Sequence, residues 1–359
     1  MKILDRYITK TLLFYTMGVM LVWVGIYALF NFINEVDLIG RQDYTALSAT
    51  IYVISDLPAV IYAHFLVIIF LGCLLGLGHL AATSQLIIIR GCTVSIMQIA
   101  KKVIISALIF AFTIIFLGEM VAPITIEYAK SYKNKALGNS VAAANWQNFW
   151  IKDGDTIINI KDNFDNATFG GVTLIKLKHN QLDSVLYADR AAFGDNNLRL
   201  DESKYYQFKQ GEKLTNVNFE NYKKYDRKIS FDKTLIDALK KDPDELSSWE
   251  LYQHIVFLVN NDLAAAVFEL ELYKRIINPL TLVAMLMLSM LFIFGSLRDS
   301  SLGKKIFLGV IISLFFELSA RIGSAVSLRF DYDTLLTTSA PTLVVLVIAY
   351  LLLKKKSAR

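Results

Sequence analysis

The stretch LAATSQLIIIRGCTVSIMQIAKK (Leu80–Lys102) connects two apolar runs, each long enough to cross a lipid bilayer. Its centre, LIIIRG, places four large aliphatic residues in a short connection, directly before Arg90 and Gly91. A Ser or Thr start and a Gly stop are typical of a short helix. Because an isolated two-turn helix is marginal in water, we expect docking to stabilise it. It either lies in the lipid interface or fits a groove on another protein.

The composition indicates a membrane protein. The chain has 359 residues, of which 55% are apolar, and this is more apolar surface than one soluble core usually buries. The apolar residues gather at the two ends of the chain, whereas residues 137–250 are polar. The runs that reach roughly 20 apolar residues are 11–34, 57–80, 103–124, 276–296, 306–328 and 335–353. We therefore predict an α+β membrane protein with six transmembrane helices and a soluble insertion between helices 3 and 4.

The basic residues of the short loops predict the orientation. Cytoplasmic loops of membrane proteins carry an excess of Lys and Arg. Four segments share this excess, and their basic residues are Lys2, Arg6, Lys10; Arg90, Lys101, Lys102; Arg298, Lys304, Lys305; and Lys354, Lys355, Lys356, Arg359. We expect both termini to be cytoplasmic and the insertion to face the outside. The net charge of +5 is then a topology signal and does not indicate nucleic-acid binding.

The insertion shows the pattern of an antiparallel sheet. From Asn148 to Phe231, short runs alternate polar and apolar residues and are separated by turn residues, which predicts a β-sandwich or jelly roll. Its strand edges either are capped within the domain or accept a strand from a partner. Ser247 and Glu250 then form a capping-box pattern that predicts a helix. The predicted domains are 1–136, 137–245 with the periplasmic jelly roll, and 246–359 with a connecting helix and spans four to six.

Motifs for chemistry are missing from the sequence. No G-x-x-x-x-G-K-[ST] occurs, since the nearest string, SLGKKI, lacks the spaced first glycine and the final hydroxyl. No two of the four histidines have metal-ligand spacing on a helix, and there is no G-x-S-x-G elbow. We therefore expect no catalytic residue, no metal and no cofactor bound by this chain.

Charged residues in or beside the spans are more informative, because placing a charge in the bilayer is costly. Glu119 is expected to bond a neighbouring helix. Glu317 and Arg321 are four residues apart and are expected to form an ion pair on one helix face. Lys130 and Lys133 lie just beyond the outer end of span three, where they either belong to a solvated face or meet an anionic lipid headgroup.

Several motifs in order resemble one known family. They are LDRYITK, LLGLGHLAATSQLIIIRGCT, GEMVAP, WIKDG and NPLTLVAMLMLSMLFIFGSLR. Together they are similar to the LptF/LptG permease family, and to its LptG branch more than to its LptF branch. The resemblance covers both membrane halves, while the insertion resembles the family mainly in placement and strand pattern.

The resemblance implies a transport function without catalysis. Such chains pair as an LptF–LptG heterodimer above an LptB ATPase dimer, which hydrolyses ATP. They take lipopolysaccharide from the inner membrane and pass it to the periplasmic bridge proteins LptC and LptA. The loop at about Thr83 to Gly91 would be the coupling helix seated in LptB. Its contact residues would be Gln85, Leu86, Ile89, Arg90 and Gly91, with Leu86 and Ile89 as anchors and Gln85 at a position where the family commonly has Glu.

The resemblance also implies basic residues that meet the phosphates of lipid A. Lys130 and Lys133 match these positions. The basic residues that the family has near the outer end of span one are replaced by Asn31, Asp37 and Leu38, so Arg41 and Arg321 are expected as substitutes. Acyl chains would meet aromatic residues of spans one and five, namely Phe14, Trp23, Phe30, Phe315 and Phe316.

Two other functions remain open from the sequence. A lipoprotein-releasing ABC permease also has a large external domain, but usually four spans. A proton-coupled secondary transporter would use intramembrane acids such as Glu119 and Glu317.

Overall fold

The computed structural model describes residues 2–91, 94–138, 149–163, 168–178, 181–194, 197–210, 215–229, 241–294, 302–330 and 332–357. Arg298 and Arg359, used in the topology prediction, lie outside these ranges. The chain forms two compact units. The helical unit comprises Met1–Ile39, Ala49–Ala129 and Ala266–Arg359, and the sheet unit comprises Gly40–Ser48 and Lys130–Ala265.

Six helices of the described chain are long and apolar enough to cross a membrane. They are α1 (Lys2–Val36), α2 (Ala46–Ala82), α4 (Ile96–Ala136), α7 (Ala266–Ile293), α8 (Leu302–Phe330) and α9 (Thr334–Ser357). Each predicted span falls on one of them, and a short helix, α3 (Gln85–Gly91), follows α2. The fold class of an α+β membrane protein with six spans is confirmed.

Helix α2 lies at the centre of the helical packing. Its residues Ile68, Phe70 and Leu74 are fully buried. A Cβ atom on Gly72 would lie 2.4 Å from the Cα of Thr16 in α1, so only glycine permits these two backbones to approach so closely. Small residues serve the same purpose wherever helices pack in a membrane without a hydrophobic driving force between them.

Helices α7 and α9 are joined by hydrogen bonds. The hydroxyl oxygens of Thr281 and Thr342 lie 2.9 Å apart, and Lys356 Nζ donates to the carbonyl of Leu291 at 3.0 Å. Polar bonds of this kind hold membrane helices together, because an unpaired polar group in hydrocarbon is costly.

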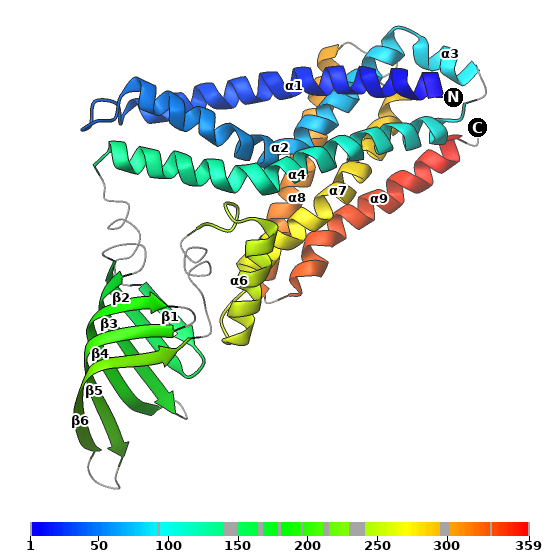
Figure 1. Cartoon of the computed structure of the whole chain (residues 1–359). Helices are drawn as coiled ribbons and strands as arrows, with labels where there is room; N and C mark the ends of the chain where they lie inside the picture. Colours follow the sequence, from blue (N-terminus) through cyan, green and yellow to red (C-terminus); the bar gives the residue numbers. More distant parts are fainter. Residues whose placement is uncertain are drawn as a thin grey trace. The chain divides into compact units, whose positions relative to one another are not determined.

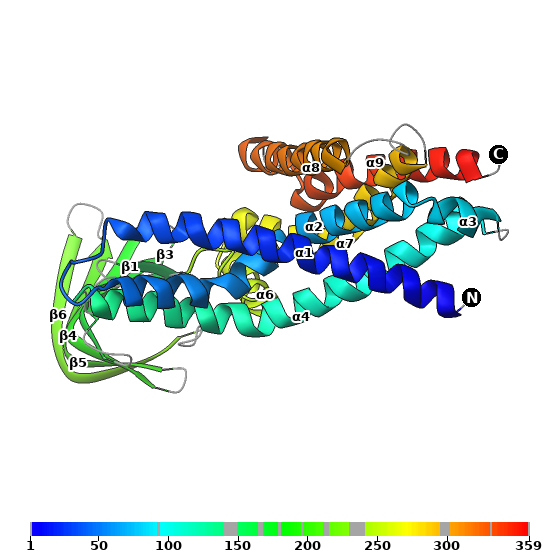
Figure 2. The same ribbon diagram turned by 90° about the horizontal axis from the view of Figure 1, so that it is seen from above.

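The two chain ends and α3 lie at the same end of the helical unit (Figure 1; Figure 2). The hydroxyl of Tyr7, near the start of α1, donates to Gln85 Oε1 of α3 at 2.8 Å. The segments with the basic excess at the N-terminus, α3 and the C-terminus therefore face one side, as the topology prediction requires.

The sheet unit contains one six-stranded antiparallel sheet in the order β1-β2-β3-β4-β5-β6 (Figure 1). The strands are β1 (Phe149–Asp153), β2 (Thr156–Asn163), β3 (Thr168–Lys178), β4 (Gln181–Gly194), β5 (Asn197–Gln210) and β6 (Thr215–Lys228). Every neighbour in the sheet is also the neighbour in the chain, so the connectivity is a meander in one sheet. The predicted antiparallel β domain is present, but its strands form one sheet, whereas a sandwich or jelly roll would have two.

The sheet curls around an apolar inner face. Ile158, Leu174 and Leu186 are buried and directly paired across β2, β3 and β4. Arg227 Nη2 of β6 donates to Thr156 Oγ1 of β2 at 2.6 Å, although three strands separate these two in the sheet order. A flat sheet could not make this bond, so strong curvature produces the enclosed core that a second layer would otherwise supply.

Helix α6 (Ser248–Asn260) is joined to the sheet at its C-terminal end. Its predicted capping box is confirmed, because Ser247 and Glu250 each bond the other's backbone N–H. At its end, the side chain of Asn261 accepts from the N–H of Gly154 at 2.7 Å, and the carbonyl of Asn261 accepts from Lys152 Nζ at 2.9 Å. These bonds explain why the compact sheet unit extends to Ala265, beyond the predicted boundary at 245.

We predict that Gly72→Val destabilises the helical unit by about 1–3 kcal/mol, the usual cost of overpacking. The added Cβ meets the backbone of Thr16, which no rotamer change can move away. The measurement is the apparent melting temperature of the purified chain in detergent. Gly25→Val on α1 is the control, because nothing lies within 4 Å of a Cβ there. Equal losses in both variants would contradict the packing argument.

We also predict that acid weakens the sheet unit through His254. This residue of α6 is buried, and burial lowers its pKa below the ordinary value. The folded state therefore binds the proton less well than the unfolded state, so stability is complete above about pH 6.5 and falls as the pH drops below it. At about pH 5.5 the loss is at most about 1.4 kcal/mol. Melting curves of the wild type and His254→Gln at both pH values measure it, and an equal acid effect in the two proteins would exclude His254.

Candidate functional site

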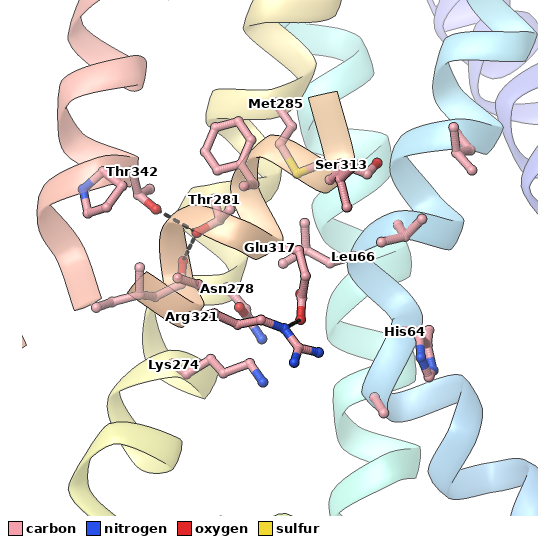
Figure 3. A pocket seen from close by; sticks show the side chains of 18 of the residues that line it. His64, Leu66, Lys274, Asn278, Thr281, Met285, Ser313, Glu317, Arg321 and Thr342 are labelled. Carbon is pink, nitrogen blue, oxygen red and sulfur yellow. Dashed lines mark hydrogen bonds and ion pairs between the residues drawn. The ribbon is translucent and has the colours of Figure 1, made fainter. Parts of the chain in front are cut away.

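A cavity of about 530 Å³ opens in the helical unit. It is lined by α1, α2, α7, α8 and α9 (Figure 3). The five helices come from both halves of the chain, so the site exists only after the two sets of spans have packed together. Its size falls in the range of about 300–1,000 Å³ that ligand pockets occupy.

One end of the cavity is charged. Lys274 of α7 and Arg321 of α8 point into the same space, beside Glu317 (Figure 3). Arg321 Nε donates to Glu317 Oε1 at 2.9 Å, which confirms the predicted ion pair. The side chain of Arg321 remains 75% exposed, and this bond uses one of the five N–H donors of the guanidinium group. Because exposed ion pairs contribute little stability, Arg321 can exchange partners at low cost.

The other end of the cavity is apolar. Figure 3 shows Met285 away from Lys274 and Arg321, and Phe316 also lines the wall. Thr281 and Thr342 are bonded to each other there, and the hydroxyl of Ser313, beside Met285, has no hydrogen-bond partner among the described residues. Cationic groups at one end and hydrocarbon walls at the other suit a molecule with phosphate groups and acyl chains.

Of the five aromatic residues predicted to line the lipid site, Trp23 and Phe316 do so. Phe14, Phe30 and Phe315 are exposed on the outside of their helices and do not line the cavity of this chain. The apolar runs in the sequence identify the helices that line the cavity, but the packing of the helices decides which face of each one turns inward.

The other predicted basic residues belong to the sheet unit. Lys130 forms an ion pair with Glu245, Lys133 is half-buried, and Arg41 is exposed in the turn after α1. The cavity therefore contains Arg321 from the predicted set, and it adds Lys274, which sequence reasoning missed. Lys274 lies just before the fourth apolar run, but no local pattern indicates that its side chain faces the cavity.

A second charged cluster joins three helices. Glu119 of α4 accepts from the hydroxyl of Tyr62 of α2 and lies 3.5 Å from Arg275 Nη1 of α7. Arg275 Nε also bonds Glu271 Oε1 at 3.2 Å, and its side chain is only 9% exposed. The prediction that Glu119 bonds a neighbouring helix is confirmed. Sequence reasoning missed its partner Arg275, although Glu271 and Arg275 have the spacing of a helical ion pair.

The short helix α3 begins after a tight turn. Thr83 Oγ1 donates to the carbonyl of His79 at 2.8 Å at the end of α2, and Ser84 has φ of 58°. The carbonyl of Ser84 then accepts from the N–H groups of Ile87 and Ile88. The left-handed conformation of Ser84 thus breaks the chain direction between α2 and α3.

The structure places the two predicted anchor residues of α3 in the core of this chain. Leu86 and Ile89 are 4% and 7% exposed. Gln85 is bonded to Tyr7 of α1. The exposed side chains of α3 are Ile87, Ile88 and Arg90, with Gly91 exposed at its end. In a seven-residue helix the i, i+3 pair shares one face, and here the chain itself covers that face.

Carboxylates gather at one place that could hold a cation. Asp242, Asp244 and Glu245 lie close together in the described part of the sheet unit. Because Glu245 is paired with Lys130 and the two aspartates are exposed, the group has the character of an ordinary acidic surface.

The chain is similar to known transport proteins over nearly its whole length. The family described as lipopolysaccharide export system permease LptF/LptG matches residues 6–355. The lipopolysaccharide export system permease protein LptG of Escherichia coli K12 is 27% identical over 363 residues, covering 99% of each chain. LptG of Haemophilus influenzae is 26% identical over 364 residues, covering 98% of each chain. With six apolar helices, an inserted sheet and a match across both membrane halves, this chain belongs to the LptF/LptG family of lipopolysaccharide export permeases.

Proposed function

We propose that this chain is a permease subunit of an ABC transporter that extracts lipopolysaccharide from the inner membrane and passes it to a periplasmic bridge toward the outer membrane. The observation that carries the proposal is the amphipathic cavity, whose cations Lys274 and Arg321 stand at one end of an apolar chamber (Figure 3). A glycolipid with anionic phosphates and several acyl chains has the matching distribution of charge and hydrocarbon.

In this proposal the chain is the LptG-like half of a heterodimer with an LptF-like permease. The exposed apolar faces of α1 and α8, which include Phe14 and Phe315, form walls that a second permease completes. Phosphates of the lipid replace Glu317 as the bonding partner of Arg321. Lys130, Lys133 and Arg41 of the sheet unit supply further positive charge. The sheet unit lies in the periplasm and delivers the lipid to LptC-like and LptA-like proteins.

Energy reaches the cavity through α3. An LptB-like ATPase dimer hydrolyses ATP in the cytoplasm, and this chain binds no nucleotide. Gln85, Leu86 and Ile89 fasten α3 to the chain, while Ile87, Ile88, Arg90 and Gly91 face the ATPase. Movement of the ATPase then moves α3 together with α1 and the core, which narrows the chamber. Both termini are cytoplasmic, in agreement with the basic residues at that end.

The alternatives have less support. A proton-coupled transporter would use an intramembrane acid such as Glu119, but Glu119 joins three helices through its bonds to Tyr62 and Arg275. A lipoprotein-releasing permease would usually have four spans, whereas six helices of the described chain can cross a membrane. Identification of the proteins that co-purify with the tagged chain separates these functions, because only the proposed one yields an ATPase together with a second six-span permease.

We predict that Ile88→Asp abolishes co-purification of the ATPase while the chain still inserts and keeps its melting temperature. Ile88 is 66% exposed, so a carboxylate there costs the fold little but cannot enter an apolar groove without a desolvation penalty of several kcal/mol. Leu86→Asp should instead lower the melting temperature, because it places the charge in the core.

Ile3→Asp is the matched control for the Ile88 prediction, since it makes the same change at an exposed position of α1, outside α3 and its preceding turn. Retention of the ATPase by Ile88→Asp would end the assignment of α3 as the coupling helix.

We predict that Arg321→Gln weakens lipopolysaccharide binding by roughly tenfold or more, the value of a lost hydrogen bond to a charged group. Arg329→Gln, an exposed residue of the same helix α8 outside the cavity, should leave binding unchanged. Photo-crosslinking of lipopolysaccharide to the purified complex measures both. Equal crosslinking in the wild type and Arg321→Gln would remove this residue from the site.

A further inference from the structure

A groove of about 270 Å³ runs between α1 and α4 and shares no lining residue with the cavity described above. Asp5 of α1 and Lys102 of α4 form an ion pair at its polar end. Beside it, the hydroxyl oxygens of Thr9 and Ser106 lie 2.7 Å apart. Ser106 donates its own proton to the carbonyl of Lys102 at 2.9 Å, so Thr9 is the donor between the two hydroxyls.

The groove changes from polar to apolar along its length. Its apolar lining consists of Leu13, Ile105, Ile109 and Phe110, and Thr113, whose hydroxyl donates to the carbonyl of Ile109, lies at the far end. Ile105 and Ile109 are 47% and 64% exposed, which leaves an open apolar wall. The predicted spans begin at 11 and 103, so the polar end lies at the membrane surface and the apolar end lies in the hydrocarbon region. An amphipathic occupant is therefore required.

Exposed cations border the groove on both helices. Arg6 and Lys10 lie on the same face of α1 as Leu13, at the spacing i, i+4, i+7. Lys101 lies on the same face of α4 as Ile105, at the spacing i, i+4. Arg6, Lys10 and Lys101 are all exposed, and within the described ranges no carboxylate forms an ion pair with any of them. Because Asp5 and Lys102 neutralise each other, these three residues give the groove a net positive rim.

We propose that the α1–α4 groove binds an anionic phospholipid of the cytoplasmic leaflet. Its phosphate contacts the rim of Arg6, Lys10 and Lys101, and the first methylene groups of its acyl chains lie against Leu13, Ile105 and Ile109. Basic pockets between membrane helices on the cytoplasmic side hold such headgroups in general. A zwitterionic lipid would bring an ammonium group against the same rim and bind less well. The proposed topology supplies only that the groove faces the cytoplasmic leaflet. Binding of a phospholipid in the groove is independent of which substrate the chain transports.

The test uses the purified, delipidated permease complex, titrated with cardiolipin and followed by native mass spectrometry. Neutralising two rim charges in Lys10→Gln/Lys101→Gln should weaken cardiolipin binding roughly 30-fold, at about fivefold for each basic residue near a membrane surface. The matched control is Lys354→Gln/Lys355→Gln, which removes two exposed lysines at the same end of the helical unit (Figure 2). The control should bind cardiolipin as the wild type does.

Four results would overturn the proposal. Equal weakening in both double variants would mean general attraction to the basic end of the chain, and equal binding of phosphatidylethanolamine would mean that the rim charge is irrelevant. Displacement of cardiolipin by millimolar inorganic phosphate would show a site for phosphate alone. Cross-linking of Ile105→Cys to a neighbouring subunit in the intact complex would assign the groove to a protein helix.

Discussion

The close contact between α1 and α2 at Gly72 is the constraint on which the helical unit depends. Apolar helices gain nothing from leaving lipid for one another unless their surfaces fit. Here the fit requires the absence of a side chain opposite the backbone of Thr16, and Gly309 of α8 lies against the side chains of Leu71 and Leu74 of α2. Because α1 and α8 both pack on α2, the two halves of the chain meet around it. The amphipathic cavity is the space left between them.

Charge inside the helical unit follows a different requirement. A charged group in the bilayer must find a partner, and the structure uses this rule in two ways. Arg275 is buried and bonded from two sides by Glu119 and Glu271, which holds α4 and α7 together. Arg321 is paired with Glu317 but exposed. The first arrangement suits a permanent joint, whereas the second suits a residue that changes partners when an anionic ligand arrives.

The sequence was sufficient for the architecture because the features that determine it are local. Run lengths predict the six spans, alternation predicts the strands, and the Ser247–Glu250 spacing predicts the cap of α6. The site depended on facts that no local pattern contains. Leu86 and Ile89 have the spacing of a binding face, but α3 folds back and turns that face into its own core. Lys274 reaches the cavity only because α7 packs beside α8, and the curl that brings Arg227 to Thr156 depends on the twist of the entire sheet.

The bond between Tyr7 and Gln85 joins α1 to α3 through two uncharged groups. A carboxylate at this position would make the joint a charge-assisted one and would expose it to counterions, since ionic strength screens charges that lie near solvent. An amide acceptor carries no net charge to screen and has no proton to gain or lose in the physiological range. The connection between the start of α1 and α3 is therefore built to keep its strength across the physiological range of salt and acidity.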